Sequence, residues 1–356
     1  MDLAAFRAHF PVLERLAYLN AGTDGPVPME AVEAATAELE RELTDGRTSA
    51  HFERRFALQD ELRSGYAALV GAEPDDVALT TSTSEGMGFV LAGLDLGPGD
   101  EIVTSDQEHP GLLGPLAAAR HRGVGVRMAP LATLHEAVDG ATTLVACSHV
   151  GWISGELAPA ELGELDVPVL LDGAQGAGAV PVDVAGLGCA AYAAAGQKWL
   201  CGADGTGFLY LESQFGERVR AIAPSYMSLL DASQGIEAAL RPRARRHDTP
   251  ALAAEVVAFS AAALGVLAAT GWSAVHRSAA GQAQVLADRL SSAGRTVAPR
   301  GDTTLVAWEE EDPAAVRDAL ADAGVIVRDL PGRPLVRASV GAWIADEDLD
   351  RLIAAL

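Results

Sequence analysis

Two kinds of hydrophobic pattern alternate along the first two thirds of the chain. Residues 29 to 43 are rich in Ala and Glu and are predicted to form a helix, as are residues 51 to 70, which are followed by a glycine. Five short apolar runs follow and predict strands: DVALT, DEIVTS, TTLVACS, VPVLLD and GFLYLE. Short apolar strands separated by helices indicate an α/β fold, in which a mostly parallel sheet is covered by helices on both faces.

Polar side chains follow several of these strands directly. Open α/β sheets place their binding and catalytic sites at the carboxyl ends of the strands. The residues found there are Glu108, His109, Ser148, His149, Asp172 and Gln175. Because several strand ends carry such residues, we expect one site along this edge of the sheet.

The last third of the chain, from about residue 245, follows a different pattern. A long Ala-rich helix precedes segments that predict strand, helix, strand, strand and helix, which is a small α+β domain. We therefore predict a large α/β domain over residues 15–245 and a smaller α+β domain formed by residues 1–14 and 246–356. The boundary falls near the basic cluster at residues 240 to 250, which is equally typical of a solvated linker.

Composition narrows the class of protein. A chain of 356 residues with 49% hydrophobic and 21% charged residues can bury an enzyme-sized core. Its net charge of -23 argues against nucleic acid and anionic membranes as partners, because both require a basic face. The N-terminus has early charges and no long apolar run, and the uncharged stretch at residues 256 to 272 is short for a membrane span. We expect a cytoplasmic protein.

The three cysteines are Cys147, Cys189 and Cys201. Their odd number and wide spacing argue against a disulfide framework or a zinc site, and no metal is expected. Cys147 and Cys189 lie among apolar residues, which is typical of small side chains in a core.

Lys198 is the only lysine in the chain, and all the other basic residues among the 26 are arginines. Arginine can take most surface roles of lysine, but it cannot readily lose its proton. A lysine amine can do so, and it then attacks carbonyl groups to form a Schiff base. A single lysine therefore indicates a reserved amine, although one lysine can also stand by chance in an arginine-biased sequence.

Other parts of the sequence contain candidates for each group that a Schiff-base cofactor such as pyridoxal phosphate requires. Thr83 and Ser84 lie between a strand and a helix and can bind phosphate, although the same pattern is typical of a helix cap. Asp172 ends an apolar strand and can hold the proton of the ring nitrogen. His109 can stack on the ring or be an ordinary exposed histidine. Arg337 can bind a substrate carboxylate or form a surface ion pair.

The order of these groups resembles the class V aminotransferase family of fold type I pyridoxal-phosphate enzymes, which includes cysteine desulfurases, isopenicillin N epimerase and C–S lyases of cystine and cysteine. The matching segments are YLNAGTDGPVP, TTSTSEGM, DQEHPG, SHVGWISG, DGAQGAGAVPVDV, GQKWLCGADGTG and VRASVGAW. They run from about residue 18 to the C-terminus. EHPG and SHVGW look most like the C–S lyase branch.

The resemblance implies a role in cofactor binding for each matching residue. Lys198 would carry the Schiff base, and Asp172 would pair with the pyridinium nitrogen. The other contacts would come from His109 on the ring face, Gln175 at the ring hydroxyl, and Thr83, Ser84 and Gln197 at the phosphate.

The substrate contacts and the partner follow from the same resemblance. Arg337 would hold the carboxylate of an amino-acid substrate, and Asn20 lies in a segment that borders the substrate pocket. Trp152 would contact cofactor or substrate, or else pack in the core. Thr249 would reach the phosphate of the neighbouring subunit in a homodimer whose active site lies at the subunit interface. Many members have histidine in place of Gln197, so the phosphate site is expected to differ.

These residues do not fix the reaction. Persulfide-forming desulfurases require a nucleophilic cysteine shortly before the carboxylate arginine, and the stretch VIVRDLPGRPLVR contains none. Elimination at Cβ requires only removal of the Cα proton and a leaving group, so we expect a C–S lyase. Epimerisation would need a second base, and transamination would need a site that admits two substrates. Both remain alternatives, as does a non-catalytic relative that binds an amino acid or acts as a scaffold.

Overall fold

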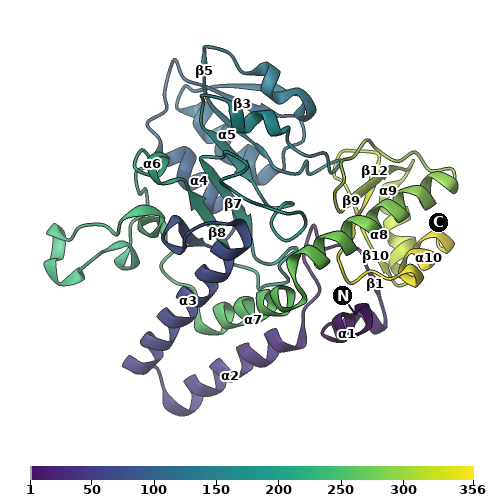
Figure 1. Ribbon diagram of the computed structural model, residues 1–356, viewed down its shortest axis with the longest axis horizontal. Coiled ribbons are helices and arrows are strands. Elements are labelled where there is room, and N and C mark those ends of the chain that lie inside the picture. The colour runs from purple at the N-terminus through teal and green to yellow at the C-terminus, as the bar shows by residue number, and fades with distance from the viewer. Residues whose placement is uncertain (1) are drawn as a thin grey trace.

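The computed structural model describes residues 2–356 and shows two regions, each built around its own sheet (Figure 1). The helices are α1 (Leu3–Ala8), α2 (Met29–Asp45), α3 (Ser49–Val70), α4 (Thr83–Gly93), α5 (Pro110–His121), α6 (Ser213–Gly216), α7 (Ala254–Thr270), α8 (Trp272–Ser292), α9 (Pro313–Asp322) and α10 (Asp346–Ala354). The strands are β1 (Ala17–Tyr18), β2 (Val77–Thr80), β3 (Glu101–Ser105), β4 (Gly125–Ala129), β5 (Thr142–Ser148), β6 (Val169–Asp172), β7 (Ala191–Ala195), β8 (Gly207–Leu211), β9 (Leu305–Glu309), β10 (Val325–Ile326), β11 (Arg328–Asp329) and β12 (Leu335–Ser339).

The larger sheet has seven strands in the order β2-β8-β7-β6-β5-β3-β4. Five neighbouring strands, β4, β3, β5, β6 and β7, run parallel. Strand β8 is antiparallel to both of its neighbours, β7 and β2. All five predicted strands are present, and the prediction of a mostly parallel α/β sheet is confirmed. Strands β4 and β7 were not predicted, because GVRMA and AYAAA contain too few β-branched residues to stand out as strands.

Successive residues of a central strand face opposite layers of helices. In β6, Leu170 packs in one core with Met87 of α4, whereas Leu171 packs in a second core with Leu62 of α3. This alternation follows from the two-residue period of a strand. Because helices cover both faces, the strands are apolar almost throughout, and a carboxylate such as that of Asp172 occurs only where its strand reaches the open edge.

The smaller region contains the antiparallel sheet β11-β12-β9, packed with α8, α9 and α10 in the predicted order of elements. The N-terminal segment joins this region, because Ala17 and Tyr18 of β1 pair with Val325 and Ile326 of β10. Helix α7, which follows residue 245, packs against α2 and α3 of the larger region (Figure 1). The domain boundary at residue 245 stays a prediction.

The described residues contain no single helix that is long and apolar enough to cross a membrane. Helices α7 and α8 meet the criteria of length and composition only as a pair, and that pair is bent by 83°. Helix α7, which contains most of the uncharged stretch at residues 256 to 272, packs in a buried core with α3 and the sheet.

Candidate active site

Strands β3 and β5 part at the carboxyl end of the larger sheet, and we call the place where their ends separate the crevice. The pairing of these two strands ends at Val103 and Val145, although β3 continues to Ser105 beside β4 and β5 continues to Ser148 beside β6. The chain leaves β3 toward one edge of the sheet and leaves β5 toward the other. The crevice therefore lies at the topological switch point, where open α/β sheets bind ligands.

The predicted site residues follow the strands around this crevice. His109 follows β3, Trp152 follows β5, Asp172 ends β6 and Lys198 follows β7. Arg337 lies on β12 of the smaller sheet and donates a hydrogen bond to the backbone oxygen of Trp152. This contact brings the smaller region to the edge of the crevice, so five separate segments of the chain contribute to one place.

The N-terminal segment holds the loop that carries Lys198. Gly25 donates a backbone hydrogen bond to the Gln197 oxygen at 2.7 Å, and Cys201 donates one to the Lys198 oxygen at 3.1 Å. A Cβ atom at Gly25 would lie 2.2 Å from the Lys198 oxygen, so only glycine fits there. Cys201 has a φ of 55°, which costs a non-glycine residue about 1–3 kcal/mol. The lysine is thus fixed by a tightly packed and locally strained turn.

Burial controls the charges of Lys198 and Asp172. Desolvation lowers the pKa of Lys198 to about 8, although part of the side chain remains exposed, and the charge of Asp172 opposes this shift. Burial raises the pKa of Asp172, whereas the charge of Lys198 and a hydrogen bond of 2.9 Å from the Ala174 N–H lower it. An amine with a pKa near 8 can act as a nucleophile and as a base close to neutral pH.

The His109 side chain caps α5. Its Nδ1 accepts a hydrogen bond of 3.0 Å from the Gly111 N–H. Desolvation and the charge of Lys198 lower its pKa to about 4, so the ring stays neutral at pH 7. The ring centroid lies 5.0 Å from that of Trp152 in an edge-to-face arrangement. Trp152 also packs with Ile153 in a small apolar cluster, so it both borders the crevice and belongs to a core.

Thr83 and Ser84 lie at the N-terminus of α4. The cap of this helix is Ser82, whose Oγ accepts a hydrogen bond of 3.1 Å from the Glu85 N–H, so the interpretation of Thr83 and Ser84 as the cap is wrong. The Thr83 hydroxyl is buried and has no hydrogen-bond partner among the described residues. The N-terminus of α5 is adjacent, because a Cβ atom at Gly111 would lie 2.6 Å from Ser84 Oγ. Two helix N-termini beside an unpaired hydroxyl are typical of an anion site.

The two predicted glutamines differ in their contacts. The Gln175 amide is engaged at both ends, since Nε2 donates to the Gly22 oxygen at 2.8 Å and Oε1 accepts from Trp199 Nε1 at 3.0 Å. The buried Oε1 of Gln197 has no partner within the described part of the chain. One N–H of Gln175 and the amide oxygen of Gln197 therefore remain available to a ligand.

Arg337 is a fully buried cation that has no carboxylate partner among residues 2–356. Its one hydrogen bond there runs to the Trp152 oxygen, while Nε and one terminal nitrogen have no partner. Desolvation and the charge of Arg328 lower its pKa to about 9. Asn20 lies beside the same strand, in a bridge with Ser339. Unpaired buried donors are costly, so this arrangement is that of a carboxylate site.

Two charged residues that the sequence analysis did not identify also face the crevice. Arg328 of β11 pairs in register with Arg337 and donates a hydrogen bond of 3.2 Å to Thr23 Oγ1. Burial raises the pKa of Asp24, and the nearby charges of Lys198 and Arg328 oppose this effect. The only signal for Arg328 is its register with β12, because a strand of two residues has no hydrophobic pattern.

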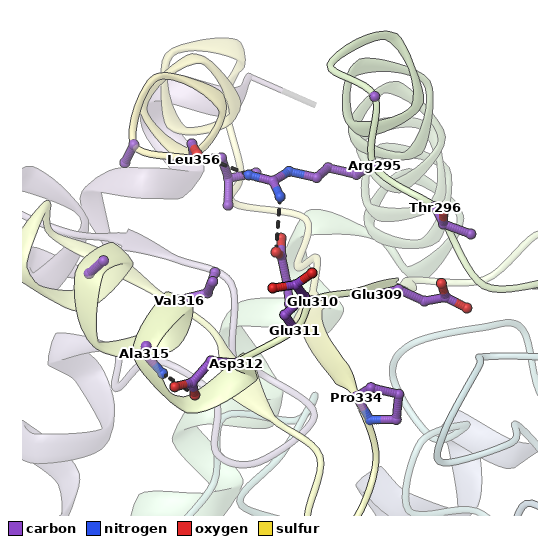
Figure 2. Close-up of a pocket in the computed structure, with 13 residues that line it drawn as sticks. Arg295, Thr296, Glu309, Glu310, Glu311, Asp312, Ala315, Val316, Pro334 and Leu356 are labelled. Carbon is purple, nitrogen blue, oxygen red and sulfur yellow. Dashed lines mark hydrogen bonds and ion pairs between the residues drawn. The ribbon is translucent and has the colours of Figure 1, made fainter.

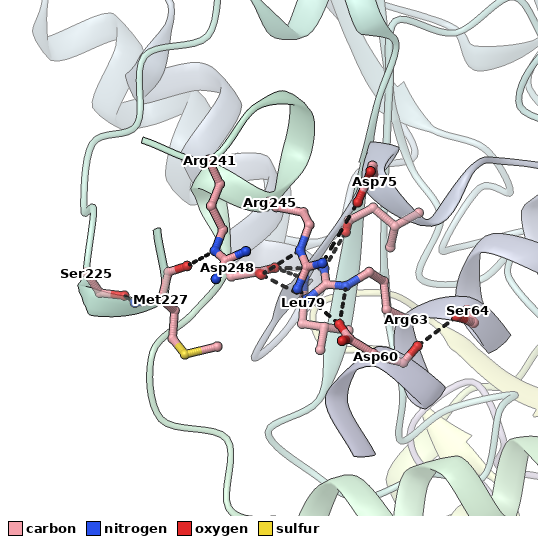
Figure 3. A network of polar contacts seen from close by, with 11 residues as sticks. Asp60, Arg63, Ser64, Asp75, Leu79, Ser225, Met227, Arg241, Arg245 and Asp248 are labelled. Carbon is pink, nitrogen blue, oxygen red and sulfur yellow. Dashed lines mark hydrogen bonds and ion pairs between the residues drawn. The ribbon is translucent and has the colours of Figure 1, made fainter. Parts of the chain in front are cut away.

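Thr249 lies beside the edge strand β2 and not at the strand ends around the crevice. Its N–H donates a hydrogen bond of 2.9 Å to the Leu79 oxygen. The neighbouring Asp248 forms a buried ion pair of 2.9 Å with Arg63 and accepts a hydrogen bond from the Leu79 N–H (Figure 3). This network fixes the segment before α7 on the edge of the sheet. The contact of Thr249 with a partner's phosphate stays a prediction.

A pocket of about 890 Å³ in the smaller region contains none of the predicted site residues (Figure 2). Arg295 pairs there with Glu310 at 2.9 Å and donates a hydrogen bond of 2.9 Å to the Leu356 oxygen. Asp312 accepts a hydrogen bond of 3.1 Å from the Ala315 N–H at the start of α9. These polar groups make structural contacts, so we place the candidate active site in the crevice of the larger sheet.

The fold and the crevice together define an α/β protein of the pyridoxal-phosphate type, with one lysine amine and one buried carboxylate at the switch point. The family model of class-V aminotransferases matches residues 17–352. The chain therefore belongs to the class-V aminotransferase family, whose members are pyridoxal-phosphate-dependent enzymes. This result confirms the resemblance on which the sequence analysis relied.

Two relatives show the range of activities in the family. The chain is 30% identical over 243 residues to a probable cysteine desulfurase of Methanothermobacter thermautotrophicus, covering 64% of this chain and 61% of the relative. It is 30% identical over 226 residues to an isopenicillin N epimerase of Amycolatopsis lactamdurans, covering 57% of this chain and 55% of the relative. The aligned segments thus span less than two thirds of the length of these relatives.

Solved structures match over nearly the whole chain. A cystine C–S lyase in complex with its reaction product, cysteine persulfide, has a TM-score of 0.92 at 26% identity and covers 97% of this chain and 98% of its own. A cysteine desulfurase of Escherichia coli has a TM-score of 0.87 at 25% identity and covers 100% of this chain and 97% of its own. These matches confirm the type I fold.

The residues around the crevice fit pyridoxal phosphate. The unpaired buried hydroxyl of Thr83 lies at a helix N-terminus, where a phosphate would find donors. Burial raises the pKa of the Asp172 carboxyl, the charge of Lys198 opposes that shift, and a protonated ring nitrogen would be a second positive partner that favours the carboxylate. The Lys198 amine supplies the group that an aldehyde requires.

Proposed function

We propose that this protein is a lyase that eliminates a group at Cβ of an amino acid, typically by breaking a C–S bond. The observation that carries this choice is the state of the three cysteines, which are all buried. Burial raises the pKa of Cys189 to about 12 and raises those of Cys147 and Cys201 as well. None of them supplies the exposed thiolate that a persulfide-forming desulfurase needs. Elimination at Cβ needs no such nucleophile.

In this proposal the residues around the crevice divide the binding of the cofactor. Lys198 would bond the aldehyde, and Asp172 would hold the proton of the ring nitrogen. The remaining contacts would come from His109 at the ring face, Gln175 at the ring hydroxyl, and Thr83, Ser84 and Gln197 at the phosphate. When bound, pyridoxal phosphate supplies an electron sink that stabilises negative charge at the substrate Cα.

The Lys198 amine, when the amino group of the substrate has taken its place at the aldehyde and left it free, would be the base that removes the Cα proton. Its lowered pKa supports this role, because a substantial fraction of the amine is neutral near pH 8 and can accept a proton. The negative charge of Asp172, which raises the pKa of Lys198, stabilises the ammonium group that results. A general base placed in this way contributes about 10²–10⁴-fold to a rate.

The unpaired guanidinium of Arg337 binds the α-carboxylate of the substrate, with Asn20 and Trp152 bordering the same space. Arg328 adds a second guanidinium in register with the first. Two cations that face one space favour a substrate with two carboxylates, and a disulfide of cysteine is such an amino acid. The match to a cystine C–S lyase over nearly the whole chain supports this substrate class.

We also propose that the protein acts as a homodimer with its active site at the subunit interface. The segment after α6 projects from the larger region (Figure 1). Its exposed apolar side chains are Ile222, Tyr226, Leu230, Ile236 and Leu240, and Ile236 is 97% exposed. Such a series of exposed apolar side chains indicates a surface that a second copy covers. Thr249 would reach the phosphate bound by the partner subunit from the end of this segment.

The cytoplasmic location expected from the sequence stays a prediction.

A panel of amino acids tests the reaction. We expect the protein reconstituted with pyridoxal phosphate to release pyruvate, ammonia and a sulfur product from cystine, and to release no pyruvate from alanine. Lys198→Arg is the matched control and should release none of these products. Formation of the D-enantiomer without pyruvate, exchange with a keto acid, or a colourless protein without products would each contradict the proposal, in favour of an epimerase, an aminotransferase or a scaffold respectively.

A further inference from the structure

Glu108 lies buried in the crevice, and the proposed function leaves it without a role. Its side chain is 5% exposed. One carboxylate oxygen accepts hydrogen bonds from the Ser148 N–H at 2.9 Å and from the Ser105 hydroxyl. The other oxygen accepts one from the Ser148 hydroxyl at 2.7 Å. The carboxylate therefore joins the β3 side of the crevice to the β5 side.

These side-chain hydrogen bonds lie where β3 and β5 no longer form main-chain hydrogen bonds with each other. The pairing of β3 with β5 ends at Val103 and Val145, so Ser105 and Ser148 end two strands that have parted. A buried backbone N–H such as that of Ser148 requires an acceptor, and the Glu108 carboxylate provides one in place of a neighbouring strand.

The bridge connects two residues of the candidate site. Glu108 is followed directly by His109, and Ser148 is paired in register with Asp172 of β6. The path from His109 to Asp172 is therefore short. It runs through the peptide bond to Glu108, through the hydrogen bonds between Glu108 and Ser148, and through the pairing of β5 with β6, where the His149 N–H donates a hydrogen bond of 2.9 Å to the Asp172 oxygen. It sets the separation between the histidine proposed for the ring face and the carboxylate proposed for the ring nitrogen.

We propose that Glu108 is a positioning residue, whose side chain holds the two sides of the crevice at the separation that pyridoxal phosphate requires. The proposal depends on the proposed ring contacts of His109 and Asp172 and on the cofactor of the family, and not on which amino acid reacts. For this role the length of the Glu108 side chain is required, and its negative charge is not. Burial raises the pKa of Glu108 to about 7, so its charge is not constant near neutral pH, whereas either form of the carboxyl group can bridge to Ser148.

Two substitutions separate reach from charge. Glu108→Gln keeps the length of the side chain and loses the charge; its amide oxygen can accept from the Ser148 N–H, and its amide nitrogen can donate to the Ser148 hydroxyl. Glu108→Asp keeps the charge but is one methylene too short to span the crevice. Glu108→Ala removes both. The measurements are the affinity of each apoprotein for pyridoxal phosphate, by fluorescence titration, and the visible circular dichroism of the bound cofactor.

We expect Glu108→Asp and Glu108→Ala to bind the cofactor at least about tenfold more weakly, with altered circular dichroism, because hydrogen bonds to a buried group are lost. Glu108→Gln should stay within about twofold of the natural protein. Equal losses in the Gln and Asp variants, or no loss in any variant, would overturn the proposal. If the Ala variant does not fold, the Gln and Asp variants decide alone, because both keep a polar group in the crevice. Failure of the proposed lyase reaction would leave these affinities unchanged.

Discussion

Two arginines are fully buried among the described residues, and their surroundings are opposite. Arg63 is 1% exposed and forms two hydrogen bonds of 2.9 Å with the Asp248 carboxylate, together with one to the Val77 oxygen (Figure 3). Arg337 is 0% exposed and has one backbone acceptor, no carboxylate and two nitrogens without a partner.

The difference indicates that Arg63 stabilises the fold, whereas Arg337 is available to bind a ligand. Both arginines lose their hydration, and the Asp248 carboxylate compensates for that loss only at Arg63. The desolvation that lowers the pKa of Arg337 to about 9 would be offset by a bound anion. We therefore assign the network around Arg63 to the anchoring of α3, β2 and the segment before α7, and the crevice to chemistry.

The largest effect is expected when Lys198, which lies in the crevice with Arg337, is replaced. Lys198→Arg keeps the positive charge but removes an amine that can lose its proton. We expect turnover to fall by at least about a thousandfold and the visible absorption of the bound cofactor to disappear, with an unchanged far-ultraviolet circular dichroism spectrum. Substantial turnover in this variant would show that the crevice is not the catalytic site.

The next largest effect is expected on the structural side. Arg63→Met leaves the buried Asp248 carboxylate without its main partner, so we expect a loss of about 3–5 kcal/mol in the free energy of unfolding. Urea denaturation of the apoprotein measures this loss. The KM for the substrate should change little in the fraction that stays folded, and a raised KM without lost stability would contradict the division between the two arginines.

The matching substitution on the ligand side should have the opposite profile. Arg337→Met removes unpaired buried donors, so the apoprotein should be as stable as the natural protein or more stable. Loss of a charge-assisted carboxylate contact of about 1.5–3 kcal/mol should raise the KM by about 10- to 100-fold. Initial rates at varied substrate concentration test this expectation, and an unchanged KM would exclude Arg337 from substrate binding.

A smaller effect concerns the pH dependence of the amine. The pKa of Lys198 is lowered to about 8, and only the neutral amine reacts with amine-directed reagents. The rate of acylation of Lys198 in the apoprotein should therefore rise with pH and level off above about pH 8, well below the usual value for lysine of about 10.4. Peptide mass spectrometry separates this label from the α-amino group, and a midpoint near 10 would contradict the burial of this amine.

Local patterns in the sequence were sufficient for much of the fold. The strand, turn and helix around Thr83 follow from a short apolar run and a helix start, and the structure has β2 and α4 there. The cap itself is Ser82, because several hydroxyl residues in a row fit equally well and only the backbone conformation selects one. Strand β7 was missed because its Ala-rich sequence becomes a strand through its neighbours, β6 and β8.

The candidate site was predictable where its residues end a strand, as Asp172 does, or follow one directly, as His149 does. Arg328 was not, because it reaches the crevice only through the register of β11 with β12. The bridge made by Glu108 was also hidden, since it depends on where the pairing of β3 with β5 ends. Contacts of this kind arise between elements that lie far apart in the sequence, and no local pattern records them.

Reduction with borohydride tests the central claim most directly, because the chain has one lysine to which the cofactor aldehyde could be bonded. The protein reconstituted with pyridoxal phosphate would be reduced, and its intact mass and peptides measured. We predict a mass increase of one reduced cofactor per chain, carried by the peptide that contains Lys198. No increase, or an increase that persists in the Lys198→Arg variant, would contradict the account.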